Sequence, residues 1–84
     1  MILPLNQYPN LDVHGETRDI IYTVLKEFIM DNIKLSNSVI VIVHGKGQGI
    51  LKREVHYYLK QMKEVKTYHL HYWNQGATIV ELNI

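Results

Sequence analysis

Apolar residues recur with a helical period in two segments of the chain. The first segment is predicted to be a helix from an N-cap at Thr17 to about Lys34, and its stripe is Ile21, Val24, Leu25, Phe28 and Ile29. The second helix is predicted to start near Ile50, and its stripe is Leu51, Val55, Tyr58, Leu59 and Met62. Spacings of three, four, seven and eight residues place each stripe on one helical face. Both helices are therefore expected to pack against a core.

Four other segments have the composition of β-strands. The five consecutive β-branched residues Val39–Val43 predict a central strand that is buried on both faces. The other strands are expected at 11–14, 66–73 and 77–82. Within the third of the four strands, Tyr68, Leu70 and Tyr72 share one face and are predicted to be core residues. Residues 74–76 are predicted to form a three-residue hairpin loop with a positive φ at Gly76.

The order strand, helix, strand, helix, strand, strand predicts an α/β fold. A strand–helix–strand crossover makes the first two strands parallel, so both strands end at the same edge of the sheet. Ligands of open α/β sheets bind at this edge. The loops that follow His14 and His44 are therefore expected to lie side by side there.

The length of 84 residues suits one small domain with a single modest core. A hydrophobic content of 46% with 20% charged residues is typical of a globular protein. The absence of cysteine excludes disulfides, thiolate metal sites and a cysteine nucleophile. Residues 1–10, which contain both prolines, are interpreted as an N-terminal arm, and residues 11–84 as the domain.

Membrane and secretion signals are absent from the pattern. The longest apolar run, Val39–Val43, is far too short to span a bilayer. The first residues, MILPL, have neither the basic region nor the long apolar core of a signal peptide. We therefore expect a soluble cytoplasmic protein with no membrane partner.

The net charge of +1 conceals an uneven distribution. Residues 44–66 carry six basic and two acidic side chains, a net charge of +4. The six basic residues are Lys46, Lys52, Arg53, Lys60, Lys63 and Lys66. Arg53, Lys60 and Lys63 lie on the polar face of the second helix, which His56 shares. This segment fits either a phosphate-bearing partner or a solvated basic helix.

Asp12 and His14 are two residues apart on the first predicted strand, so their side chains are expected on the same side. A carboxylate beside an imidazole orients the ring and favours its protonated form. The pair is therefore a candidate acid–base group. The alternative is a structural role, in which His14 caps a turn and Asp12 accepts a hydrogen bond from the loop.

A glycine-rich loop, HGKGQG, follows the central strand at residues 44–49. Gly45, Gly47 and Gly49 allow a positive φ and a close approach to a ligand, and the next helix directs its first amides into the loop. This predicts an anion site, with Lys46 as an added charge. The loop matches neither a dinucleotide-binding loop, because Ile50 replaces its last glycine, nor a P-loop. A glycine-rich turn without a ligand is the alternative.

Five histidines raise the question of a metal site. His69 and His71 share a strand face, but the chain has no His-x-x-x-His pair and no cysteine. No metal site is predicted, and these two histidines are expected to be half-buried or exposed. Trp73 and the six tyrosines are interpreted as packing residues, with base stacking as the alternative.

Three segments in this order resemble the Smr (small MutS-related) domain over about residues 11–82. They are LDVHG at 11–15, VHGKGQGILK at 43–52 and TIVEL at 78–82. The resemblance implies a two-layer α/β sandwich, β-α-β-α-β-β, with a four-stranded mixed sheet and two helices. That fold is similar to a domain of a bacterial translation initiation factor that binds the small ribosomal subunit. The family often has a glycine-rich stretch before the last strand, and here only Gly76 is present.

The resemblance further implies nucleic-acid binding and, in many members, endonuclease activity on DNA or RNA, including messenger RNA on ribosomes. We expect His14, oriented by Asp12, to act as general base or acid with His44 as its partner. The residues expected to bind phosphate are Gly45, Lys46, Gly47, Gly49, Lys52, Arg53, Lys60 and Lys63. Two histidines fit metal-independent RNA cleavage, while a mechanism with Mg²⁺ or Mn²⁺ on DNA stays open.

The main alternative is a non-catalytic module that binds DNA, RNA or the ribosome and belongs to a larger MutS-like chain. Its basis is size, because a domain of 84 residues offers little surface for selecting a substrate. A phosphate-ligand or protein-docking domain without nucleic-acid binding is a third reading.

Overall fold

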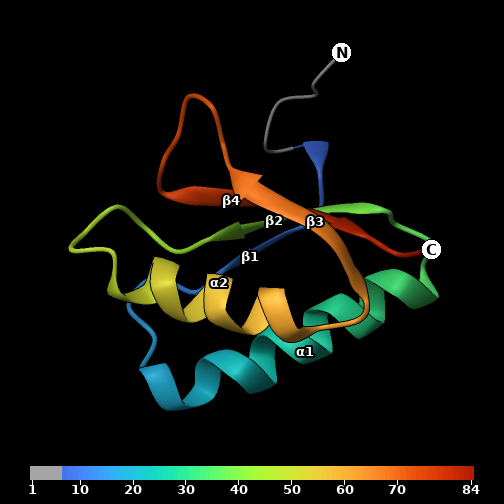
Figure 1. Cartoon of the computed structure of the whole chain (residues 1–84), viewed down its shortest axis with the longest axis horizontal. Helices are drawn as coiled ribbons and strands as arrows, with labels where there is room; N and C mark the ends of the chain where they lie inside the picture. Colours follow the sequence, from blue (N-terminus) through green and yellow to red (C-terminus); the bar gives the residue numbers. More distant parts are fainter. Residues whose placement is uncertain (1–6) are drawn as a thin grey trace.

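The computed structural model describes residues 7–84 and contains two helices and four strands (Figure 1). The elements in chain order are β1 (Asn10–Asp12), α1 (Arg18–Lys34), β2 (Val39–Val43), α2 (Ile50–Gln61), β3 (Val65–Leu70) and β4 (Ala77–Leu82). The predicted element order and both predicted helices are confirmed. Residues 1–6 of the predicted arm lie outside the described residues. Residues 7–9 lead into β1, and the carbonyl oxygen of Pro9 accepts a hydrogen bond from Val41 N at 2.9 Å.

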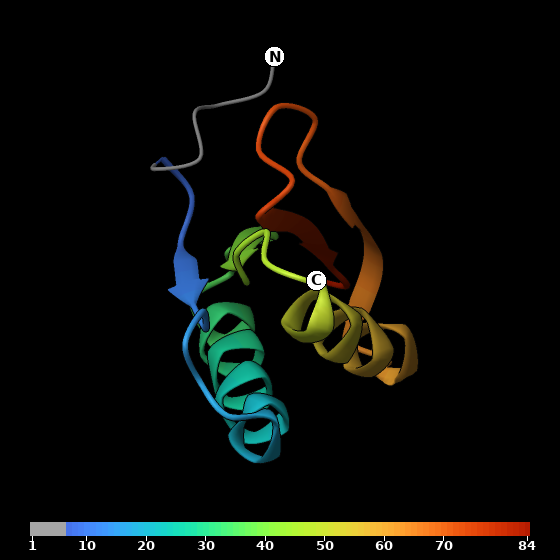
Figure 2. The same ribbon diagram turned by 90° about the vertical axis from the view of Figure 1, so that its left-hand side faces the viewer.

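The four strands form one mixed sheet in the order β1-β2-β4-β3. β1 is parallel to β2, whereas β4 is antiparallel to both β2 and β3. It follows that β1, β2 and β3 all run in the same direction. Their carboxyl ends, and the three loops that follow them, therefore meet at one edge of the sheet (Figure 2). The sequence predicts two of these loops at this edge, and the topology adds the third.

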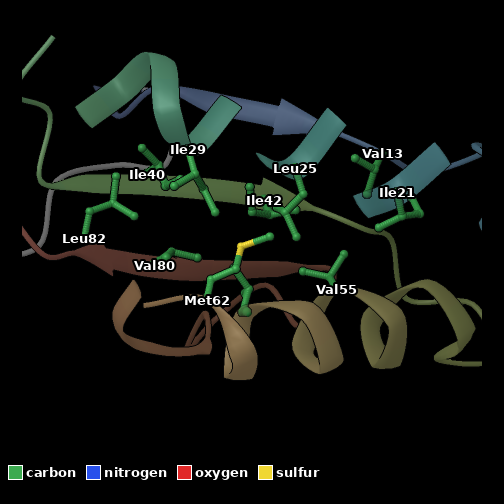
Figure 3. Close-up of a cluster of buried hydrophobic side chains, with 11 residues drawn as sticks. Val13, Ile21, Leu25, Ile29, Ile40, Ile42, Val55, Met62, Val80 and Leu82 are labelled. Atoms are coloured by element: carbon green, nitrogen blue, oxygen red, sulfur yellow. The ribbon is translucent and has the colours of Figure 1, made fainter. Parts of the chain in front are cut away.

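Both helices lie on the same face of the sheet, which gives the expected two-layer α/β sandwich (Figures 1 and 2). Side chains from both helices and the facing strand residues form one core (Figure 3), which includes Ile21, Leu25, Ile29, Ile40, Ile42, Val55, Leu59 and Val80. β2 is a central strand, and Ile40, Val41 and Ile42 are all fully buried. Its uninterrupted β-branched sequence suits a strand with an inaccessible position on each face.

Three predictions about the third strand and the loop that follows it are wrong. β3 ends at Leu70, and the connection to β4 is a six-residue loop, 71–76, in place of the expected three residues. Tyr72 therefore leaves the sheet and is 79% exposed, although its alternation with Tyr68 predicts a core position. Gly76 has no positive φ. A Cβ at Gly76 would lie 3.3 Å from the backbone of Gly45, so glycine is needed there for close packing of two loops.

Within residues 7–84, neither helix combines the length and apolarity that crossing a membrane requires.

Candidate functional site

A pocket of about 390 Å³ opens at the edge where β1 and β2 end. Its lining comes from the β1–α1 turn, the whole glycine-rich loop and the first turn of α2. His14 and Gly15 form one side, and residues 44–52 form the other. The parallel pairing of β1 with β2 brings these two segments together, since Asp12 is opposite Val43 in the register. The structure thus joins the two motifs that the sequence separates by about thirty residues.

Asp12 and His14 form a direct pair at the mouth of this pocket. The Asp12 Oδ1 atom accepts hydrogen bonds from the backbone N of His14 at 3.0 Å and from its ring Nδ1 at 2.5 Å. The predicted contact is therefore present, although a turn after β1, and not strand alternation, positions His14. Because Nδ1 carries the shared proton, Nε2 is the ring nitrogen left to exchange a proton with a ligand.

The charge state of this pair follows from the same contacts. The hydrogen bond from the His14 ring holds the pKa of the Asp12 carboxyl below its usual value, so the carboxylate is ionised at neutral pH. The side chains of His14 and Asp12 are 68% and 52% exposed, which leaves the imidazole open to solvent and ligands. An oriented, accessible imidazole beside a carboxylate is the arrangement that general acid–base catalysis requires.

The glycine-rich loop forms the second side of the pocket. Gly45, Gly47 and Gly49 all have positive φ, and Gly49 is the N-cap of α2 with a φ of 80°. No side chain caps the start of α2. Its first backbone amides therefore lack an intrahelical partner and face the loop, where the helix dipole favours an anion. Lys46 and Lys52 line the same pocket and add positive charge.

His44 occupies the interior behind this loop and is only 3% exposed. Its ring Nδ1 donates to the carbonyl oxygen of Gly45 at 2.9 Å, because that oxygen can only accept. Its Nε2 is hydrogen-bonded to Thr78 Oγ1 at 2.8 Å, and the same hydroxyl contacts His56 Nε2 at 2.7 Å. When the His44 ring is neutral, the Thr78 hydroxyl donates its proton to His44 Nε2 and accepts a hydrogen bond from the Nε2–H of His56. The three side chains form one directed chain of hydrogen bonds.

Burial stabilises the neutral form of both histidines in this chain. The pKa of His44 is lowered mainly by burial and also by the positive charge of Lys52. The pKa of His56 is lowered by burial, then by the charges of His44 and Lys52. Since both ring nitrogens of His44 already have protein partners, this geometry favours a role in holding the Gly45 peptide over direct proton exchange with a ligand.

Gly76 connects the glycine-rich loop to the third loop at this edge. Its carbonyl oxygen accepts hydrogen bonds from His44 N and Gly45 N, both at 2.9 Å. Two backbone amides that bind one carbonyl fix the start of the glycine-rich loop against the start of β4. The 71–76 loop and the glycine-rich loop are therefore directly joined at this edge.

The structure separates the predicted phosphate-binding cations into two groups. Lys46 and Lys52 line the pocket, and Arg53 is exposed in the first turn of α2 but does not line it. Lys60 is ten residues beyond Ile50, which is about 15 Å along the axis of α2. Lys63 follows the end of that helix and lines a different depression, near Tyr22 and Tyr58. The structure does not bring Lys60 and Lys63 to this pocket.

His56 and Thr78 are site-supporting residues that the sequence interpretation did not identify. The sequence pattern places His56 on the polar face of α2, but this residue borders the apolar stripe and is half-buried. Thr78 alternates with Val80 and Leu82 on β4, so its side chain faces the helices. This alternation predicts that the Thr78 side chain faces the core. It does not predict that the Thr78 hydroxyl lies between the ring nitrogens of two histidines.

Among residues 7–84, no three histidine, aspartate or glutamate side chains are grouped in a way that would hold a metal ion. His69 is exposed on β3, and His71 is half-buried in the 71–76 loop.

The model of the Smr domain matches residues 11–83, which is nearly the whole chain. This chain belongs to the Smr domain family. The match begins one residue into β1 and ends just after β4, so it contains both motifs of the pocket.

Curated relatives of this Smr domain include two proteins named Endonuclease MutS2. One, from Caldanaerobacter subterraneus, is 33% identical over 78 residues, and one, from a Geobacillus species, is 36% identical over 75 residues. These matches cover 89% and 86% of this chain but 10% of each relative. The chain therefore corresponds to a small part of the MutS2 proteins.

Solved structures show the same fold. The Smr domain of Thermus thermophilus MutS2 has a TM-score of 0.86 and 23% identity, and the match covers 90% of this chain and 99% of that one. The stand-alone small MutS-related protein YdaL from Escherichia coli has a TM-score of 0.81 and 22% identity, covering 92% of this chain and 68% of that one. The expected Smr architecture is confirmed.

The Thr78→Val substitution tests the buried hydrogen-bond chain. It removes the hydroxyl and leaves buried His44 Nε2 without a partner, which should lower the free energy of unfolding by roughly 1–3 kcal/mol. Urea denaturation measures this change. Thr78→Ser keeps the hydroxyl and should retain most of the stability. Equal stability of the Val and wild-type proteins would contradict the hydrogen-bond assignment.

The pH dependence of stability tests the neutral state of the two histidines. Their pKa values are lowered in the folded state, so the unfolded chain binds more protons below about pH 6.5. The free energy of unfolding should therefore fall as the pH is lowered from 7 to 5, a window above the range of the carboxyl groups. The His56→Gln variant keeps a hydrogen-bond donor for Thr78 and removes one titrating ring. Its free energy of unfolding should therefore fall less over this pH range than that of the wild type. Stability that is constant or increases over this window would contradict the assignment.

Proposed function

We propose that this Smr domain is a nucleic-acid endonuclease that cleaves the phosphodiester backbone of RNA or nicks DNA. The observation that carries the proposal is the Asp12–His14 pair, whose accessible imidazole lies beside a glycine-rich phosphate pocket. The similarity to proteins named Endonuclease MutS2 supports it. In the proposed complex, a backbone phosphate binds the amides at the start of α2, and Lys46 balances its charge.

On RNA, the Nε2 atom of His14 accepts the proton of a 2′-hydroxyl group. The 2′-oxygen then attacks the adjacent phosphorus, the bond to the 5′-oxygen breaks, and that oxygen takes a proton from water, which reaches the exposed site. The carboxylate of Asp12 stabilises the imidazolium that forms. On DNA, which has no 2′-hydroxyl group, the same nitrogen would deprotonate an attacking water molecule.

In this proposal His44 is a positioning residue. Its ring holds the Gly45 carbonyl and Thr78, so it acts through the loop whose amides bind the phosphate. The role predicted for His44 from the sequence, as the acid–base partner of His14, requires its ring to release Gly45 or Thr78, because both ring nitrogens are hydrogen-bonded within the protein. Cleavage assays with and without EDTA test whether the reaction requires a divalent metal ion.

A non-catalytic binding module is the second candidate. The observation that favours it is the 10% coverage of the MutS2 relatives, which fits a domain that delivers a larger chain to DNA, RNA or a ribosome. Salt-dependent binding without cleavage of any substrate would support this candidate over the endonuclease.

The His14→Ala substitution separates the two candidates. Loss of the general base should reduce cleavage of labelled RNA, duplex DNA or branched DNA by roughly 100- to 10,000-fold. Binding should change less than tenfold, because the phosphate contacts come from the glycine-rich loop. Cleavage rates and binding isotherms on the same substrates measure both effects. Full cleavage activity in the variant would remove His14 from the mechanism.

Two matched lysine substitutions test where the phosphate binds. Lys46→Ala should lower the slope of log affinity against log salt by about one phosphate contact, because Lys46 lines the pocket. Lys60→Ala removes the same charge at the far end of α2 and should leave this slope nearly unchanged. Binding titrations at several salt concentrations provide the slopes. An equal effect of both substitutions would show that the whole basic helix binds the backbone.

A further inference from the structure

The 71–76 loop carries two exposed aromatic side chains next to each other. Tyr72 is 79% exposed and Trp73 is 83% exposed. Their ring centroids are 4.6 Å apart at an interplanar angle of 83°, so the two rings form an edge-to-face pair. This contact leaves most of both rings in solvent. Large aromatic side chains are normally buried for a substantial part of their area, so an exposed pair indicates a binding surface.

Hydrogen bonds within the loop hold this pair in place. The ring Nδ1 of His71 accepts from the backbone N of Trp73 at 3.2 Å and of Asn74 at 2.9 Å. The side-chain oxygen of Asn74 accepts from Gly76 N at 2.9 Å. The backbone that carries Trp73 is therefore fixed at both its start and its end. A loop whose backbone is already ordered loses less entropy when its side chains bind a ligand.

The same loop is attached to the phosphate pocket. The Gly76 carbonyl binds the amides of His44 and Gly45, and the backbones of Gly76 and Gly45 lie in close contact. In both views the loop rises from the pocket edge of the sheet on the side away from the helices (Figures 1 and 2). The aromatic pair thus belongs to the same edge as His14 and the glycine-rich loop, and it is free of the helical layer.

Stacking on a base requires that the face of the base is accessible. Inside a regular duplex, both faces of each base are covered by neighbouring base pairs. Unpaired bases expose their faces, and aromatic side chains next to a cationic groove bind them without regard to sequence. The pocket here is cationic and its phosphate contacts are backbone amides, which likewise carry no sequence preference.

We propose that Tyr72 and Trp73 form a stacking site for an unpaired base of the strand whose phosphate occupies the glycine-rich loop. The substrate class is then single-stranded or locally unpaired nucleic acid, and a continuous duplex binds less well. This inference rests on the proposed function, since it takes the phosphate in the loop from it. Docking of a partner protein on the aromatic pair is the competing use, and the test below distinguishes it.

Trp73 is the only tryptophan in the chain, so its intrinsic fluorescence reports on this loop alone. Titration with a single-stranded RNA or DNA oligonucleotide should quench this fluorescence, and the same sequence annealed into a blunt duplex should quench it much less. Comparison of the RNA and DNA arms identifies the preferred sugar. Unchanged fluorescence at saturating single strand, with binding confirmed by anisotropy of a labelled oligonucleotide, would overturn the inference and leave protein docking.

Substitutions provide the second measurement. Trp73→Ala should weaken single-strand binding roughly 5- to 100-fold by anisotropy, and Trp73→Phe should retain most of the affinity. Duplex affinity should change little in both variants. Tyr57→Ala is the matched control, because Tyr57 is also exposed but lies on α2. Wild-type single-strand affinity in Trp73→Ala would overturn the inference.

The His14→Ala variant separates failure of this inference from failure of the proposed function. Quenching by single strands in both proteins, without cleavage by the wild type, would sustain the stacking site and overturn the endonuclease. Cleavage by the wild type without quenching would sustain the endonuclease and overturn the stacking site. Quenching in both proteins, with cleavage lost only in the variant, is the result expected if both hold.

Discussion

The parallel pairing of β1 with β2 determines where the functional groups of this domain lie. Each strand is followed by one of the two sequence motifs, and parallel strands end at the same edge. The Val13 amide extends the pairing through a hydrogen bond to the Val43 carbonyl at 2.8 Å. This bond joins the residue before His14 to the residue before His44. An antiparallel pairing would place the two motifs at opposite ends of the sheet.

The two motif histidines have opposite environments, and this difference divides the work of the site. His14 is exposed, and of its ring nitrogens only Nδ1 is hydrogen-bonded within residues 7–84, whereas both ring nitrogens of the buried His44 are hydrogen-bonded. An exposed imidazole can exchange protons rapidly with a ligand. A buried one has a fixed tautomer and holds its neighbours in position. In the proposed endonuclease, His14 would therefore carry out the proton transfer and His44 would hold the pocket in shape.

The sequence predicts those features that depend on local periodicity. The stripe in α1, the β-branched run of β2 and the motif that pairs Asp12 with His14 each contain their own signal, and the structure has all three. The position of Tyr72 could not be predicted in this way. Its exposure depends on where β4 stops pairing with β3, which is a property of two strands and not of one.

The residues that support the pocket from behind also cannot be identified from local sequence patterns. His56 and Thr78 are 22 residues apart and meet only because α2 packs on the helical face of β4. Similarly, Lys60 shares a polar helix face with Arg53, and helix geometry alone places the two at different distances from the loop. A charge total over residues 44–66 contains no information about that distance.

β1 is the outermost strand on one side of the sheet, and this position affects how the site can move. Within residues 7–84, β1 has three residues and pairs only with β2, whereas β2 has a neighbouring strand on each side. Short edge strands open at a lower free-energy cost than central strands. Opening of β1 alone would carry His14 away while the glycine-rich loop stayed on β2. In the proposed endonuclease, the bound phosphate would then stay in the loop while the general base was withdrawn, which would interrupt cleavage without releasing the substrate.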